Sequence, residues 1–531
     1  MSDESVDDVG VAPTDARPWW KPSWESRWTW VVAVSVLSLV AHLWRLGLRP
    51  LAHDETIDAW FSWNAREFGV MEYDPVYHGP LRFYLVGPVL RWVGTGAAEV
   101  RLVAALAGVA TTAIIAASTR TLGRAGAPLA ALVFVVSPTV LTVTRTGRED
   151  SLVALVSVCM LLLVARALVA PRPAHLLGLG ALLACSFALK ETTFLFGLAA
   201  LCFFLAGGAL AAARPLQCRD AVRRLGTLGR EVWLAALTVF ALTFMFIFTS
   251  GFRYAAGLES GMLDGIEYWW SQHDVGRGGQ PWFFYLAVYV TYEWLLLGLA
   301  VVGVAVTVRR RSLVGAWFTW MMVSQVALYA WAGEKFAWLA VHPLLPGVLL
   351  SGLGAEALVA RVRRARPSVA MFAGAGFAAL VAATAVVAVR PAITDGADPR
   401  ELLVTVQTSV DVPPIAQRLR EMHEAGEIES IIVDTTSGGS WPWVWYLHGL
   451  DGVSYRLIRP EEPLPEADAL IVFATEFPPA AAESATVERF RLREWWVPDY
   501  DNMSIGDALH WFFTRSTWSP TGSSDQYLVL P

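Results

Sequence analysis

Residues 361–389 read RVRRARPSVAMFAGAGFAALVAATAVVAV, and this stretch decides the class of fold. Its last 21 residues, 369–389, carry no charged side chain. A helix of about 20 apolar residues is long enough to cross the hydrocarbon core of a bilayer. The arginines just before it are typical of short cytoplasmic loops. The stretch therefore predicts a membrane-spanning helix that begins on the cytoplasmic side.

Ten more apolar runs of similar length precede this one. The chain is 55% apolar and only 17% charged, below the charged fraction of about 25% in soluble domains. Residues 81–93 form a shorter run with Arg82, Pro88 and Arg91, which favours a helix at the membrane interface. We therefore expect an all-α polytopic membrane domain with about eleven spans, at residues 28–48, 100–118, 127–143, 152–170, 174–189, 194–212, 232–248, 283–306, 313–331, 339–358 and 369–389.

The loops between these runs alternate in charge. Arginines gather in every second loop, as at 214–230, 309–311 and 361–366, whereas acidic residues mark the others. Because basic loops stay inside, the N-terminus is predicted to be cytoplasmic, and eleven spans place the C-terminus outside the cell membrane. Residues 1–27 are acidic and contain proline, so we expect a disordered cytoplasmic tail.

The last part of the chain has the pattern of a soluble domain. Residues 391–531 hold 22 acidic residues, nine arginines and no lysine. A helix at 412–425 and strands at 429–435, 469–474 and 526–530 predict an extracytoplasmic α/β domain. None of the four cysteines lies in it, so disulfides are not expected. The predicted domains are therefore the tail 1–27, the membrane domain 28–390 with its outer loop 49–99, and the soluble domain 391–531.

The first outer loop carries the leading catalytic candidates. His53, Asp54 and Glu55 lie beside apolar and aromatic residues, and His78 follows in the same loop. A carboxylate whose pKa is raised by apolar neighbours can act as a general base, and Asp54 is the first candidate, with Glu55 beside it. The alternative is an acidic triplet that is simply solvated.

Further charged groups are predicted on the same outer face. The third span ends at Arg148, Glu149 and Asp150. A charged cluster between apolar helices costs free energy, which favours a functional role. The alternative is that these side chains cap the helix and reach the interface. Cations suit the phosphate of a lipid headgroup. The other candidate substrate-binding residues are Lys190, Glu191, Arg277, Glu293, Lys335 and His342.

No Cys/His array indicates zinc, and no nucleotide-binding fingerprint or basic patch indicates a nucleic-acid partner. The alternative is a hard divalent ion held by Asp54, Glu149 and Asp150. The sequence motifs do not require a cofactor.

Two outer-loop motifs, RPLAHDE at 49–55 and YHGPL at 77–81, resemble the first outer loop of the GT-C glycosyltransferases, the superfamily of the dolichyl-phosphate-mannose protein mannosyltransferases. In that superfamily, an Asp after the first span acts as a base or orients the acceptor. Asp54 matches this Asp. The resemblance therefore implies a multi-span GT-C fold and a polyprenyl-phosphate sugar donor.

Five further motifs resemble one branch of that superfamily, the archaeal flippase-activity-associated proteins of N-glycosylation, which also occur in bacteria. The chain departs from the branch at Phe336 and Ala337, where Thr or Met followed by Pro is expected, so the kink there is in doubt. The motifs are TRTGRED at 144–150, ALKET at 188–192, GGQPW at 278–282, GEKFAWLAVH at 333–342 and WPWVWYL at 441–447.

Two functions of different classes follow. The first is an inverting glycosyltransferase that moves a sugar from a polyprenyl-phosphate donor to an acceptor on the outer face, as part of protein glycosylation or cell-envelope synthesis. The second is a non-catalytic partner of a lipid-linked glycan flippase, in which the same pocket binds a lipid phosphate without cleaving it. Replacing Asp54 by Asn separates these two.

Overall fold

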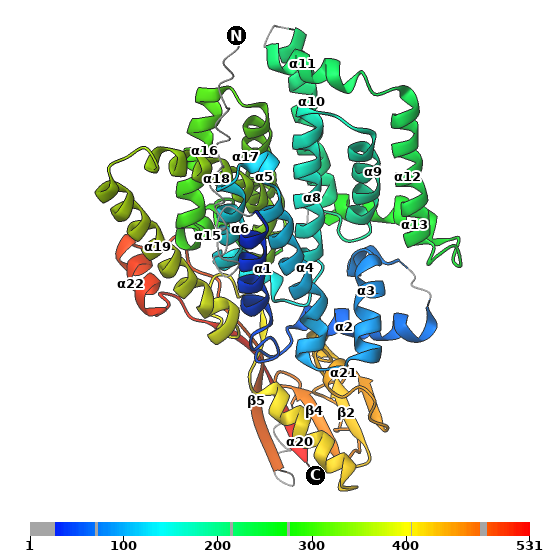
Figure 1. Ribbon diagram of the computed structural model, residues 1–531. Helices are drawn as coiled ribbons and strands as arrows, with labels where there is room; N and C mark the ends of the chain where they lie inside the picture. The colour runs from blue at the N-terminus through cyan, green and yellow to red at the C-terminus, as the bar shows by residue number, and fades with distance from the viewer. Residues whose placement is uncertain are drawn as a thin grey trace, which may run out of the picture.

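The computed structural model describes residues 27–69, 73–212, 216–272, 277–404, 406–477 and 486–530. The predicted N-terminal tail lies almost wholly outside these residues. A bundle of helices forms the larger part of the molecule, and a sheet lies at one end of it (Figure 1). The predicted fold class, a helical membrane domain followed by an α/β domain, is confirmed.

Within the described residues, six helices are long and apolar enough to cross a membrane: α4 (Ala97–Ala117), α8 (Asp150–Val169), α12 (Arg230–Phe248), α17 (Leu313–Trp331), α18 (Val341–Val362, with the turn η2 at Ala337–Ala340) and α19 (Pro367–Val389, continued by the π-helical turn η3 at Arg390–Thr394). Two bent pairs raise the number to eight: α6 (Gly126–Val136) with α7 (Pro138–Thr144), and α15 (Phe284–Tyr292) with α16 (Trp294–Arg310). Three shorter apolar helices follow the remaining runs: α1 (Arg27–Leu43), α9 (Pro173–Phe187) and α10 (Thr193–Ala212). Each predicted run thus contains a helix, while the count of eleven spans stays a prediction.

The two bent pairs meet at their breaks. Pro138 has no N–H to donate, and Ser137 before it is extended, so α6 ends there and α7 begins at a 68° bend. Glu293 separates α15 from α16 at a bend of 102°. Its Oε1 accepts hydrogen bonds from Ser137 Oγ at 2.8 Å and from Thr139 N at 2.9 Å. One carboxylate therefore accepts from a hydroxyl and a backbone N–H at the other break.

Helix α18 lies at the centre of the bundle and packs against α16, α17 and α6. Glycines make the closest of these contacts. A Cβ at Gly303 would lie 2.3 Å from Leu350 O, and one at Gly354 would lie 2.1 Å from Leu299 O. Small residues let helix backbones approach closely, which is how membrane helices gain packing energy. The buried side chains around this contact include Trp317, Phe318 and Tyr292.

Short helices cover the end of the bundle nearest the sheet. These are α2 (His53–Phe68), η1 (Pro75–Tyr77), α3 (Leu81–Trp92), α13 (Gly257–Met262) and α14 (Asp264–Gln272), while α5 (Thr119–Leu122) and α11 (Leu216–Leu225) lie toward the other end (Figure 1). Helix α3 has 12 residues, too few to span a bilayer. The prediction of a short helix at 81–93 is thus confirmed, and its place at the interface stays a prediction.

A six-stranded mixed sheet forms the core of the C-terminal part, in the order β1-β5-β6-β4-β2-β3. Strand β2 (Ile431–Asp434) is parallel to β3 (Val453–Arg456) and β4 (Ala469–Phe473). The strands β1 (Gln407–Thr408), β5 (Thr486–Trp495) and β6 (Gly522–Leu530) pair antiparallel. The helices are α20 (Val412–Glu424), α21 (Trp443–Tyr446) and α22 (Ile505–Thr514), with a turn η4 (Thr436–Gly438).

The sheet part touches the helical part beside α2. Tyr446 Oη accepts from the backbone N–H of Leu51 at 2.9 Å, and Gln407 Nε2 donates to Pro50 O at 3.1 Å. Trp445 packs edge-on to Trp63, with ring centroids 6.4 Å apart. These contacts anchor the outer loop that begins α2, and they bring a strand of the C-terminal part to the predicted site.

Candidate active site

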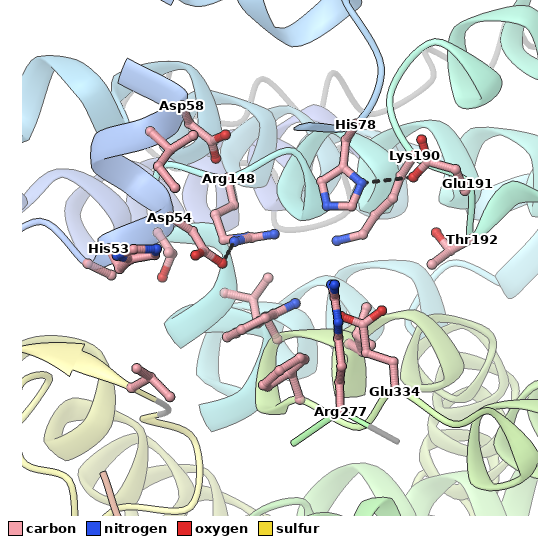
Figure 2. Close-up of a pocket in the computed structure, with 18 of the residues that line it drawn as sticks. His53, Asp54, Asp58, His78, Arg148, Lys190, Glu191, Thr192, Arg277 and Glu334 are labelled. Atoms are coloured by element: carbon pink, nitrogen blue, oxygen red, sulfur yellow. Dashed lines mark hydrogen bonds and ion pairs between the residues drawn. The ribbon is translucent and has the colours of Figure 1, made fainter. Parts of the chain in front are cut away.

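A cavity of about 550 Å³ lies between the sheet-side ends of the membrane helices and the C-terminal part. Segments far apart in the sequence form its walls: the start of α2, the loop at 76–78, the end of α7, residues 190–192, Arg277, the loop before α18, and residues 403, 404, 406 and 407 with Arg493. Seven of the predicted site residues line it (Figure 2): His53, Asp54, His78, Arg148, Lys190, Glu191 and Arg277.

Asp54 lies in the first turn of α2, where the helix dipole stabilises a carboxylate. Its side chain is 38% exposed to the cavity, whereas that of Arg148 is 8% exposed. Arg148 Nη1 contacts Asp54 Oδ2, and its guanidinium lies over the Trp338 ring, 4.7 Å from the centroid. Figure 2 shows Asp54 facing the interior, with Lys190 and Arg277 entering from other walls. Asp54 is thus paired with one cation and faces two others.

Glu55, the next residue, points away from the cavity and is fully buried. It accepts from Arg101 Nε and Nη2, both at 2.7 Å, from Gly147 N at 2.6 Å and from Ala52 N at 2.9 Å. Burial raises the pKa of Glu55, but the charges of Arg101 and Arg49 outweigh it and lower the pKa to about 2. A carboxylate so saturated cannot take a proton from a substrate, so we assign Glu55 a structural role.

Lys190 enters the cavity from the turn between α9 and α10. Its Nζ donates to Glu149 Oε1 at 2.6 Å and to Asp150 Oδ1 at 2.7 Å. Burial alone would lower the pKa of Lys190, but Asp150 and Glu149 raise it, so the amine stays charged. His342 Nε2 lies 2.8 Å from the same Asp150 oxygen. Glu149, Asp150 and His342 therefore hold Lys190 from behind the wall rather than lining the cavity.

His78 closes the cavity beside Lys190. Its Nδ1 lies 2.8 Å from Glu191 Oε2, and its Nε2 lies 3.6 Å from Glu149 Oε1. Burial lowers the pKa of His78, but the charges of Glu149 and Glu191 raise it above its ordinary value. Tyr73 Oη also donates to Glu191, at 3.0 Å. Glu191 thus ties the loop at 73–78 to the turn at Lys190.

Arg277 reaches the cavity from a loop that pairs with the loop before α18. The backbone N–H of Lys335 donates to Arg277 O at 3.1 Å. Gly278 has φ +92°, and a Cβ there would lie 2.2 Å from Lys335 O, so this close approach needs glycine. Lys335 does not line the cavity, because its Nζ donates to Ala332 O at 2.5 Å. Glu334 and Phe336 line the cavity instead.

Glu293 lies away from the cavity, at the helix breaks described above. An acid inside a membrane span predicts a functional site by default, but here the carboxylate serves two helix ends. Among the described residues, no three His, Cys, Asp or Glu side chains are arranged to hold a metal ion.

Two residues at this site, Arg82 and Arg493, are not among the candidates predicted from the sequence. Arg82 contacts Asp58 and lies 3.4 Å from Glu149 Oε2, behind the wall. Its position in a short apolar run was a usable signal. Arg493, on strand β5, lines the cavity although it is more than 400 residues from Asp54 in the chain. No local pattern marks it.

Known proteins resemble this chain in one segment of its sequence and in its fold. Residues 77–216 match the model of the dolichyl-phosphate-mannose-protein mannosyltransferase family. The structure of ArnT from Cupriavidus metallidurans bound to undecaprenyl phosphate is similar at a TM-score of 0.55 and 15% identity, over 94% of this chain and 98% of that one. Its apo structure gives 0.54 and 15%, over 94% and 97%. No curated protein sequence matches the chain.

A second similar fold is that of the Archaeoglobus fulgidus oligosaccharyltransferase in its apo form. It aligns at a TM-score of 0.54 and 12% identity, over 81% of this chain and 64% of that one. At identities this low, the similarity shows the fold alone. The chain therefore shares its fold, a helical bundle followed by a C-terminal sheet, with these two solved proteins, and residues 77–216 are similar to the dolichyl-phosphate-mannose-protein mannosyltransferase family.

Proposed function

We propose that this protein transfers a sugar from a polyprenyl-phosphate-linked donor to an acceptor hydroxyl, in the cavity on the sheet side of the membrane. The observation that carries the proposal is that Asp54, which is paired with Arg148, faces Lys190 and Arg277 across one cavity. The likeness to ArnT, solved with undecaprenyl phosphate, supports the choice of donor.

The chemistry is a single displacement. The acceptor oxygen forms a bond to the anomeric carbon of the sugar, and the bond from that carbon to the phosphate oxygen breaks. The electron pair leaves with the polyprenyl phosphate, and the hydroxyl proton goes to Asp54. Attack from the face opposite the phosphate inverts the anomeric centre. Arg148 contacts Asp54 Oδ2, so Oδ1 is the oxygen that an acceptor hydroxyl would approach.

The cations have distinct parts in this proposal. Arg277 is exposed at the cavity, so its guanidinium can bind two phosphate oxygens with little rearrangement. Lys190 is already held by two carboxylates and provides a fixed positive charge aimed at the leaving group. Because side chains supply this charge, we propose that the transfer requires no metal cofactor. We also propose that the sugar is a hexose.

The proposal is tested in a strain that lacks the chromosomal gene, by measuring polyprenyl-phosphate-linked sugars by mass spectrometry. We expect the donor to accumulate in this strain and to disappear when the parent gene is returned. Asp54→Asn should leave the donor accumulated, because the hydroxyl proton has no acceptor. The matched control is Asp451→Asn, an exposed carboxylate in the C-terminal part, which should restore turnover.

Binding is measured separately, with undecaprenyl phosphate and the purified full chain. Asp54→Asn should bind it as the parent does, whereas Arg277→Gln should bind about ten- to a hundredfold more weakly, since a hydrogen bond to a charged group contributes about 1.5–3 kcal/mol. Full turnover by Asp54→Asn would overturn the enzymatic proposal. Unchanged binding by Arg277→Gln would remove Arg277 from the donor site.

A further inference from the structure

Helix α22 of the C-terminal part presents three different faces. Trp511 is buried against Trp496 and Trp518, and Phe512 packs against Trp294 at the start of α16, with ring centroids 5.5 Å apart. Ile505, Leu509 and Phe513 are 82%, 55% and 75% exposed. At about 100° per residue, these three lie on one stripe, one turn apart. His510 and Thr514 form an exposed polar stripe beside it.

The helix is held rigidly in this orientation. Ser504 and Asp507 form a capping box at its first turn, with Asp507 N donating to Ser504 Oγ at 3.0 Å. At its other end, Arg515 Nε donates to Glu401 Oε1 at 2.7 Å, and Tyr292 Oη of α15 donates to Glu401 Oε2 at 2.7 Å. Both ends of α22 are therefore fixed, and these contacts hold the apolar stripe on the outside of the protein.

The stripe continues an exposed apolar surface of the helical bundle. Trp294 contacts Phe512, and its Nε1 donates to the backbone oxygen of Val290 at 2.8 Å. Val290 belongs to the apolar pair α15 and α16, and it is exposed. Figure 1 shows α22 at the side of the helical bundle near α19, away from the sheet. Helix α19 also exposes large apolar side chains, among them Phe372 and Val386.

We infer that α22 is an interfacial membrane helix, which inserts Ile505, Leu509 and Phe513 into the leaflet on the sheet side and anchors the C-terminal part to the bilayer. A helix that lies in the interface has an apolar face in the acyl region and a polar face toward water, as the two exposed stripes of α22 do. A protein partner that covered this face would also have to displace lipid from the exposed side of α15, where Val290 lies. The inference does not depend on the proposed sugar transfer.

The test is site-directed spin labelling of the full chain in vesicles of phosphatidylcholine and phosphatidylglycerol. The four native cysteines are first replaced by serine, and single variants Leu509→Cys and Phe513→Cys are labelled. The matched control is His510→Cys, which is exposed on the polar stripe of the same helix. Oxygen should relax the labels at 509 and 513 more than a water-soluble nickel chelate does, and this order should reverse at 510.

Two results would overturn the inference. In the first, the nickel chelate relaxes the labels at 509, 510 and 513 more than oxygen does, and to the same extent at all three positions. The stripe would then face water. In the second, neither oxygen nor the nickel chelate relaxes the labels at 509 and 513, and their spectra show dipolar broadening from a nearby label. A second copy of the protein would then cover the stripe. If a label lowers the melting temperature of the protein, Ile505→Cys replaces that variant, because Ile505 is the most exposed of the three.

Discussion

At the scale of single residues, Asp54 and Glu55 show how adjacent carboxylates acquire different roles. Successive residues of a helix point about 100° apart, so the first turn of α2 directs Asp54 to the cavity and Glu55 to the protein interior. Asp54 keeps a side chain that is 38% exposed, while Glu55 is bound by Arg101 and by two backbone N–H groups. In the sequence the two carboxylates are neighbours that follow His53. Only the direction of each side chain in the structure decides which one can react and which one has a structural role.

This difference predicts a stability effect for Glu55. Glu55→Gln leaves Arg101 buried without its anion, so we expect a loss of about 3–5 kcal/mol of unfolding free energy. The pKa of Glu55 is about 2 in the folded protein against an ordinary 4.5, so its contribution is complete above about pH 4.5 and is lost as the pH falls toward 2. Thermal melting of the detergent-solubilised protein from pH 7 to pH 3 should show this for the parent and not for the variant.

The control for that measurement is Glu488→Gln, which removes a surface ion pair with Arg418, at 2.5 Å. Exposed pairs contribute at most about 1 kcal/mol, so this variant should melt close to the parent. Equal melting of the two variants would contradict the structural role of Glu55.

At the scale of elements, the two helix breaks depend on each other. Ser137 Oγ accepts from Val140 N at 3.2 Å and donates to Glu293, so the start of α7 and the bend between α15 and α16 share one hydrogen-bond network. A break inside a membrane exposes backbone donors that have no water to bind, and Glu293 accepts from one of them, the N–H of Thr139. None of the residues of this network lines the cavity.

Substitution of Glu293 should therefore change stability rather than ligand binding. Glu293→Leu removes the acceptor from Ser137 and Thr139, and we expect a loss of about 1–3 kcal/mol. Glu293→Gln keeps an acceptor oxygen of the same reach, so it should melt nearer to the parent. Both variants should bind undecaprenyl phosphate with the affinity of the parent. A large loss of affinity in Glu293→Gln without a change in melting would instead make Glu293 part of the binding site.

At the scale of the whole molecule, charge sets the orientation that we predict. Arginines gather at the end of the bundle opposite the sheet, as at the end of α16, while the C-terminal part is acidic. Short basic loops stay on the cytoplasmic side, so the sheet, the cavity and α22 should all lie outside.

This orientation is testable in the cysteine-free protein, with a membrane-impermeant maleimide applied to cells whose outer barriers have been opened. Arg459→Cys, in an exposed turn of the C-terminal part, should be labelled at once. Arg310→Cys, exposed at the end of α16, should be labelled only after detergent is added. Labelling of position 310 but not 459 would reverse the topology and place the cavity in the cytoplasm.

The sequence alone determined the features that depend on local pattern. Long apolar runs predict helices wherever they occur, and helix 412–425 and the strands near 431, 469 and 526 were placed correctly, because burial of a short apolar run is a local property. Strand β5 and helix α22 were not predicted. Two of the ten residues of strand β5 are buried and five are charged, so no apolar run marks the strand, and α22 is a ten-residue helix in an aromatic segment that resembles a membrane-interface belt.

Only the tertiary structure decided which charged residues share the cavity. Outer loops contain many carboxylates and cations, and sequence order does not say which side chains converge. The fold brings Arg493 of the sheet to the wall near Asp54, withdraws Glu55, Glu149, Asp150 and His342 behind the wall, and removes Glu293 to the helix breaks. The physical reason is that a buried charge must find a partner, and the identity of that partner is fixed by packing between distant elements rather than by neighbours in the chain.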